Sequence, residues 1–232
     1  MREFVSFLSR HQSKLALSGL LIVASAISLI LGTVHIRVSG TNNFVFLIYN
    51  LGLAWIPFLA AGVAYAASHN RITFYLIMPV CTLVWLAFFP NAPYLLTDFQ
   101  HLADANGSTP LWYDVIVLIW FAWTGLLLGI ASLYLIQEIV TRTFNSWIGW
   151  IFTVSAVILS SVGVYLGRFL RWNSWDLLQD PLPIARDMYG IVRHPIANLP
   201  TYVFTILFTL LILFIYVAIY LLGRIIRERP HR

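Results

Sequence analysis

An aspartate and a histidine three residues apart form the first pair in this chain that could do chemistry. They are Asp98 and His101, and Tyr94 lies four residues before Asp98. At this spacing in a helix, Asp98 and His101 share one face. A carboxylate or an imidazole held beside a substrate can act as a general base. Asp98 and His101 are therefore the candidate catalytic residues if the protein is an enzyme, which the sequence leaves uncertain.

A pair of arginines could supply the binding part of the same chemistry. Arg168 and Arg171 also lie three residues apart, so we expect them to point together from the end of a helix. The planar guanidinium binds phosphate through two parallel hydrogen bonds, and such a pair would hold an anionic head group. A charge near the hydrocarbon needs a counter-ion, and Asp98 is the partner that we expect for Arg168. The candidate substrate-binding residues are Asn91, Tyr94, Asp114, Arg168, Arg171, Asn173 and Asp176.

Three of these candidates have an alternative structural explanation. Asp114 stands at the start of an apolar run, where a carboxylate faces the positive end of a helix dipole. Asn173 or Ser174 can cap a short helical turn that has Asp176 in its first positions. Helix capping and ligand binding both remain open for these residues.

Metal chemistry has little support in the sequence. Asp98 and His101 supply two ligands, with His194 as a distant third, whereas a zinc site usually needs three protein ligands with further support. The sequence also lacks the Gly-x-Ser-x-Gly, His-Glu-x-x-His and P-loop motifs. We expect no metal site and no cofactor.

Membrane helices must position all of these residues. The chain has 232 residues, of which 60% are apolar and only 10% are charged, against about 25% charged in soluble domains. This excludes a soluble globule, a disordered chain and a nucleic-acid binder, despite a pI of 9.6. Six stretches approach the length of about 20 apolar residues that a membrane helix needs. They are Leu15–Val34, Phe44–Ala67, Phe74–Phe89, Trp112–Ile139, Trp147–Phe169 and Tyr202–Leu222.

The third of these stretches is short and interrupted. Pro90 and Pro93 break it, and apolar residues then recur on one helical face through Leu102. We expect a broken third helix followed by a short interfacial helix. The predicted fold is a single all-α domain over residues 1–232, with about six transmembrane helices. We expect the proline-rich stretch 177–200 to form an outer loop, or alternatively a lid over the charged cluster.

The distribution of charge predicts the orientation. Nine of the 14 Lys and Arg residues fall at the two termini and in the 68–73 and 140–146 loops, and all three glutamates fall with them. The opposite side has five arginines and all six aspartates. Because short basic loops stay in the cytoplasm, we expect a multi-pass protein of the plasma (inner) membrane with both termini cytoplasmic.

Small residues four apart mark the faces through which these helices pack. Gly125 and Gly129 form one pair, and Gly163 and Gly167 form another. Ala24, Ser28 and Gly32 continue the pattern in the first helix. Such faces allow close helix approach, either within one chain or in a homodimer, and the sequence does not choose between these.

Two longer motifs resemble a known family. The run Phe-Phe-Pro-Asn-Ala-Pro-Tyr before Thr97-Asp98, and the run Gly-Arg followed by Arg171-Trp172-Asn173-Ser174-Trp175-Asp176, are similar to an uncharacterised bacterial family of polytopic membrane proteins, catalogued as a domain of unknown function. Asn50 with Ala54-Trp55-Ile56-Pro57 also fits its pattern. The resemblance covers the second to the sixth helix. It implies a polytopic membrane protein and supplies no activity.

Three functions remain open at this point. The first is an accessory or assembly subunit with an ion-pair cluster on the extracytoplasmic face. The second is a membrane enzyme acting on an anionic, lipid-linked substrate at the outer face, and the third is a small-solute binding or transport protein. We expect the lipid bilayer as a partner, together with an anionic lipid or lipid-linked ligand, and no nucleic acid. If the polar side chains of the cluster satisfy one another, a structural role is favoured. If they line an open cavity, a ligand-binding role is favoured.

Overall fold

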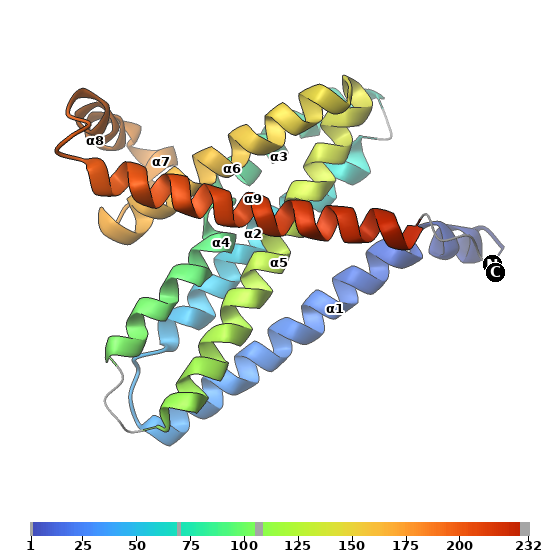
Figure 1. Cartoon of the computed structure of the whole chain (residues 1–232). Helices are drawn as coiled ribbons and strands as arrows, with labels where there is room; N and C mark the ends of the chain where they lie inside the picture. The colour runs from blue at the N-terminus through green and yellow to red at the C-terminus, as the bar shows by residue number, and fades with distance from the viewer. Residues whose placement is uncertain (1, 69–70, 105–108, 228–232) are drawn as a thin grey trace.

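Helices make up the whole regular structure. The computed structural model describes residues 2–68, 71–104 and 109–227, and every regular element in these ranges is helical. Figure 1 shows their arrangement, and η1 denotes a 3₁₀ helix. They are α1 (Arg2–Ser39), α2 (Val45–Ala67), α3 (Arg71–Phe88), α4 (Asn91–Tyr94), η1 (Leu95–Asp104), α5 (Leu111–Thr143), α6 (Ser146–Phe169), α7 (Asp176–Gln179), α8 (Pro181–Arg193) and α9 (Leu199–Arg227).

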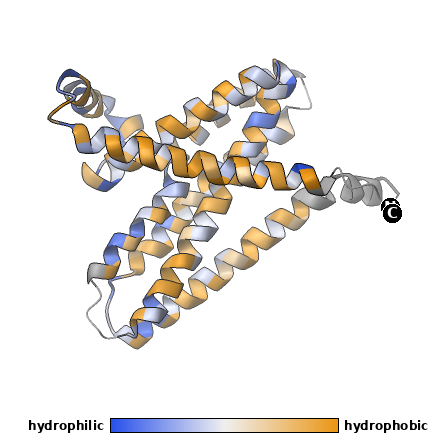
Figure 2. Ribbon diagram, viewed as in Figure 1, coloured by the Kyte–Doolittle hydropathy of each residue, from blue (hydrophilic) through white to orange (hydrophobic). Residues whose placement is uncertain are grey.

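Six segments of the described chain are long and apolar enough to cross a membrane. This confirms the all-α fold with about six spans. Figure 2 shows apolar residues along the long helices and hydrophilic residues gathered toward their ends and on η1. The spans are Leu15–Ser39, Val45–Ala67, Thr73–Leu102, Leu111–Thr143, Ser146–Phe169 and Leu199–Ile225.

The central helix is α5, which contacts α1, α2, α4, η1 and α6. One apolar cluster gathers around Trp85 and Phe89, and it includes residues of α5, α6 and α9. A second cluster joins α5 to α1 and α2 around Leu21 and Phe121. The other faces of the outer helices expose large apolar side chains, as lipid-facing helices do.

The expected break in the third span is present, and its cause is local. Helix α3 ends at Phe88, and proline at positions 90 and 93 cannot continue its hydrogen bonds. The side-chain amide of Asn91 donates to the Phe88 carbonyl oxygen at 3.0 Å, which satisfies one of the carbonyls left open at the end of α3. The chain then continues as α4 and η1, which confirms the predicted short helix after the break.

Two glycines let this broken segment sit tightly against its neighbours. A Cβ atom on Gly125 of α5 would lie 2.8 Å from the Ala92 carbonyl oxygen and would also collide with the Leu95 side chain. A Cβ atom on Gly163 of α6 would lie 2.6 Å from Cγ of Pro90. Both small-residue faces of α5 and α6 therefore contact residues 90–95 of the same chain. A homodimer through such faces stays a prediction.

The face of α1 formed by small residues has a similar role. Ser28 Oγ lies 3.2 Å from Thr124 Oγ1 of α5. A Cβ atom on Gly32 would lie 3.1 Å from the Phe121 ring, also on α5. These contacts fix α1 against the central helix.

The stretch 177–200, expected as a loop, is largely helical. It contains α7 and the 13-residue α8. Pro181 stands at the first position of α8, where its missing N–H costs nothing because that N–H has no partner inside the helix. The prolines therefore begin a helix here and do not prevent one.

The start of α1 and the end of α9 lie on one side of the molecule (Figure 1). In Figure 1, α1 begins and α9 ends at the right of the view. We call the opposite side the distal face, which carries residues 40–44, the end of η1 and residues 170–198. That the distal face is extracytoplasmic stays a prediction.

Candidate functional site

The ion pair expected between Asp98 and Arg168 is present. Arg168 Nη2 donates to Asp98 Oδ1, and the two side chains are 5% and 1% exposed, respectively. Asp98 belongs to η1 and Arg168 to the last turn of α6, so the pair joins two segments that are 70 residues apart. The second carboxylate oxygen of Asp98 accepts a hydrogen bond from Asn50 of α2 at 3.3 Å.

The remaining nitrogens of Arg168 are also engaged. Its Nε donates to Thr97 Oγ1 at 2.8 Å, and Thr97 Oγ1 in turn donates to the Tyr94 carbonyl oxygen at 2.7 Å. Its Nη1 lies 3.2 Å from His101 Nε2. The guanidinium carbon sits 4.0 Å from the centroid of the Tyr94 ring, a cation–π contact. We call Asn50, Tyr94, Thr97, Asp98, His101 and Arg168 the charge network.

The contact with Arg168 assigns a role to one ring nitrogen of His101. An arginine side chain can only donate, so His101 Nε2 must accept from Arg168 Nη1. The ring of His101 also rests on Phe46, with ring centroids 4.5 Å apart.

The 3₁₀ geometry of η1 explains how neighbouring residues reach one guanidinium. With three residues per turn, Asp98 and His101 stand directly above one another on one side of the helix. Leu95 belongs to the same row and is buried against Gly125. The packing of Leu95 therefore fixes the direction in which Asp98 and His101 point.

A second contact joins the same two parts of the chain. Asn91 Nδ2 donates to Ser174 Oγ at 2.7 Å, in addition to its bond with Phe88. The neighbouring candidates Asn173 and Asp176 satisfy each other. Asp176 Oδ2 accepts from the backbone N–H and the side-chain amide of Asn173, at 2.7 and 3.2 Å. Asp176 therefore closes the turn before α7.

Arg171 does not point together with Arg168, contrary to our expectation. Helix α6 ends at Phe169, and Arg171 adopts a φ of 62°, in the left-handed region. The helical spacing of three residues therefore does not apply. Arg168 is buried in the charge network, whereas Arg171 is exposed and makes no hydrogen bond or ion pair with any described residue.

Asp114 belongs to a separate buried cluster. Its Oδ1 lies 2.8 Å from His35 Nε2 and accepts a hydrogen bond from Thr109 Oγ1 at 2.6 Å. Asp114 and His35 are 2% and 3% exposed. The ring of His35 stacks on Phe44, with centroids 4.3 Å apart, and its Nδ1 has no hydrogen-bond partner in the described structure. The Asp114 carboxylate thus holds α1 against the start of α5.

Sequence reasoning missed His35, Thr97 and Thr109. The first span was expected to end at Val34, one residue before His35, whereas the observed span continues to Ser39. The spacing of Ser28, Gly32 and His35 by four and three residues was a usable signal, because it places His35 on the face that meets α5. Hydroxyl groups such as Thr97 and Thr109 have no spacing that marks them in advance.

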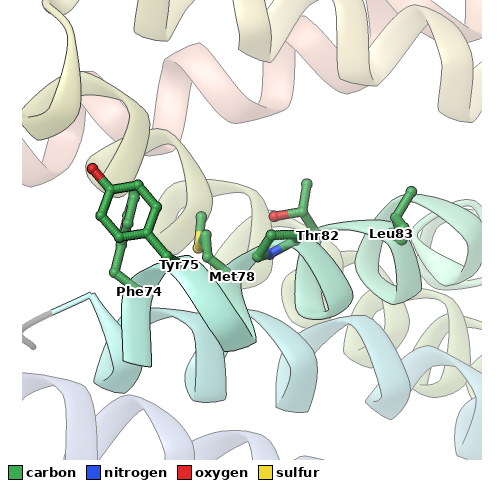
Figure 3. Close-up of a pocket in the computed structure, with 6 residues that line it drawn as sticks. Phe74, Tyr75, Met78, Thr82 and Leu83 are labelled. Atoms are coloured by element: carbon green, nitrogen blue, oxygen red, sulfur yellow. The ribbon is translucent and has the colours of Figure 1, made fainter. Parts of the chain in front are cut away.

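The members of the charge network contact one another, and the hollow in Figure 3 lies elsewhere. That hollow is an open apolar surface of α3 near Pro79, and none of its lining residues belongs to the network. Among the described residues, no group of three His, Cys, Asp or Glu side chains could hold a metal ion. The hollow is lined by Phe74, Tyr75, Met78, Pro79, Thr82 and Leu83.

The chain matches the family described as Protein of unknown function (DUF1361) over residues 49–215, well over half of its length. The chain belongs to this family. The DUF1361 region runs from α2 into α9 and contains the whole charge network, whereas His35 lies outside it. No curated protein and no solved structure matches the chain. The motifs of the sequence analysis thus lie inside a family whose description carries no activity.

Proposed function

We propose that this chain is an accessory or assembly subunit of a membrane system, and that its charge network is a structural lock on the distal face. The observation that carries the proposal is that every nitrogen of the buried Arg168 side chain contacts the protein. Its three nitrogens are directed at Asp98, Thr97 and His101, and its flat face at Tyr94. Because each of its nitrogens already contacts the protein, and the side chain is 5% exposed, the guanidinium is poorly placed to bind a substrate phosphate.

The candidate general bases are occupied in the same way. Both carboxylate oxygens of Asp98 accept hydrogen bonds, and His101 Nε2 accepts from Arg168. A base needs a free lone pair within reach of the proton that it removes. These contacts support a structural role over the enzyme alternative. The ion pair of the charge network joins η1 to the last turn of α6 at the distal end of the spans, which gives the transport alternative no separate support.

The lock connects three segments that are far apart in the sequence. Residues of α2, η1 and α6 meet at Asp98, and Asn91 adds the turn before α7. In a lipid environment the hydrophobic effect does not drive helices together, because lipid tails are as apolar as the helix surfaces, so close packing and interhelical hydrogen bonds hold them. Directional bonds therefore set the relative positions of these segments, and a subunit that presents a fixed surface to others needs this.

A double-mutant cycle tests the proposal. Asp98→Asn and Arg168→Gln should each lower stability by about 3 kcal/mol, because each leaves one buried charge without its counter-ion. The double variant should lose clearly less than the sum of the two. The measurement is thermal and denaturant unfolding of the purified chain in detergent, followed by the fluorescence of its nine tryptophans.

Arg171→Gln is the matched control, because Arg171 is an exposed arginine three residues from Arg168. It should leave stability unchanged. If Asp98→Asn folds with full stability, or if the two losses simply add, the network is no lock and the proposal fails.

A further inference from the structure

Helix α8 has one apolar side that the rest of the chain does not cover. Ile184 and Ile191 are buried against the protein. Leu182, Tyr189 and Val192 are 60%, 63% and 66% exposed, and Ala185 is exposed between them. The spacing of these four by three, four and three residues places them on one side of the helix. We call Leu182, Ala185, Tyr189 and Val192 the apolar stripe.

Two hydrogen bonds hold α8 at the level where membrane spans end. Asp187 Oδ2 accepts from Trp172 Nε1 at 2.8 Å, just after the end of α6. The Ile191 carbonyl oxygen accepts from Tyr202 Oη at 3.1 Å, in the first turn of α9. Figure 1 shows α8 at the same end of the molecule as the start of α9. Because α6 and α9 both cross the membrane, this level is the boundary between lipid and water.

Two arginines border the apolar stripe. Arg186 follows Leu182 by four residues and Arg193 follows Tyr189 by four, so each stands one turn beyond a member of the stripe. Arg193 Nη1 donates to Tyr189 Oη at 3.3 Å, and both arginines are exposed. Arg186 makes no ion pair with any residue that the structure describes. The acid of this helix, Asp187, lies on the other side, where it is bonded to Trp172.

We infer that α8 is an interfacial anchor that binds anionic phospholipids of the leaflet at the distal face. The apolar stripe lies among the acyl chains, and Arg186 and Arg193 extend from its border to the lipid phosphates. An amphipathic helix of this kind lies in the plane of the interface, with its apolar side inward and its basic residues at head-group depth. The inference is independent of the proposed function, because it uses no residue of the charge network.

Spin labels on opposite sides of α8 test the position of the helix. The full chain, with Cys81→Ser, receives a nitroxide at Val192→Cys in the stripe or at Gly190→Cys on the other side. A Cβ atom at position 190 would meet nothing within 4 Å, so the first atom of this side chain has space. In phosphatidylcholine nanodiscs, we expect the label at 192 to be several-fold less accessible to a water-soluble nickel complex and more accessible to oxygen than the label at 190.

Two outcomes would overturn the position. Equal nickel accessibility at 190 and 192 would mean that α8 stands in water. Protection of the label at 192 from both nickel and oxygen would mean that a protein surface, from a second copy or another subunit, covers the stripe. Both labelled chains should melt at the temperature of the parent chain, which establishes that they are folded.

A lipid titration tests whether Arg186 and Arg193 bind the head groups of anionic lipids. Phosphatidylglycerol added to the detergent-purified chain should raise its melting temperature by more than an equal amount of phosphatidylcholine does. Arg186→Gln with Arg193→Gln should remove this difference, whereas Arg171→Gln, an exposed arginine outside α8, should keep it. Equal shifts with the two lipids in the parent chain, or an undiminished difference in the double variant, would overturn the assignment of the head group.

Discussion

Asn91 and Ser174 are joined by a hydrogen bond of 2.7 Å from the side-chain amide to the hydroxyl oxygen. The bond links the turn after α3 to the turn after α6. The ion pair of Asp98 and Arg168 also joins these two parts of the chain. The hydrogen bond shows that the two sequence motifs meet through more than charge. The two motifs therefore form one structural unit, although 83 residues separate Asn91 from Ser174.

This link should be measurable as a coupling energy. Asn91→Ala and Ser174→Ala should each destabilise the chain, and the coupling between them should be about 0.6 kcal/mol, the size found for hydrogen bonds between membrane helices. Asn91→Ala should cost more, because Asn91 also bonds to the Phe88 carbonyl. Denaturant unfolding in detergent measures both losses. Ser146→Ala, an exposed serine at the other end of α6, is the control. Strictly additive losses would argue against the link.

Position 125 should require glycine, because a larger residue there has no room beside Ala92 and Leu95. Gly125→Ala places a Cβ 2.8 Å from the Ala92 carbonyl oxygen, so α5 and the broken segment must separate. We expect a loss of about 1–3 kcal/mol, the usual cost of overpacking. Gly62→Ala in α2 is a matched control, because its Cβ would meet nothing within 4 Å. There the better helix propensity of alanine should keep or raise the melting temperature. Similar effects at both positions would contradict the role of close approach.

The buried pair of His35 and Asp114 should behave as a unit. His35→Phe preserves the ring that stacks on Phe44 but removes the Nε2 contact with Asp114, so we expect a loss of about 2 kcal/mol. The double variant His35→Phe with Asp114→Leu should lose less than the two single variants together, because no buried carboxylate is then left short of a donor. Thermal unfolding of the four chains in one detergent compares them. A double variant that loses the full sum would show that the two residues act separately.

The ion pair of Asp98 and Arg168 is predictable from the sequence because it follows from a single physical requirement. A buried arginine near the hydrocarbon requires a counter-ion, and Asp98 stood at matching depth. Arg171 was misplaced because spacing alone does not reveal that α6 ends at Phe169. Asp114 was assigned to a cap or a ligand site because its partner His35 lay beyond the expected end of the first span.

Helix α8 shows a different reason for a wrong expectation. Proline content favours a loop, yet Pro181 occupies the single region of a helix that tolerates proline well. The pattern of the apolar stripe was present in the sequence, but it becomes informative only once the stretch is known to be helical. The spans themselves were predictable because length and hydropathy determine them directly.

The chain order of the ion pair has a consequence for biosynthesis. Asp98 emerges from the ribosome 70 residues before Arg168. The nascent third span therefore enters the insertion machinery with a carboxylate whose counter-ion has not yet been made, and the glycine surfaces on which residues 90–95 will rest follow only with α5 and α6. The ion pair and the glycine contacts of this segment can therefore form only after α5 and α6 have been synthesised. The packing of this segment is thus completed late, by a helix synthesised two spans afterwards.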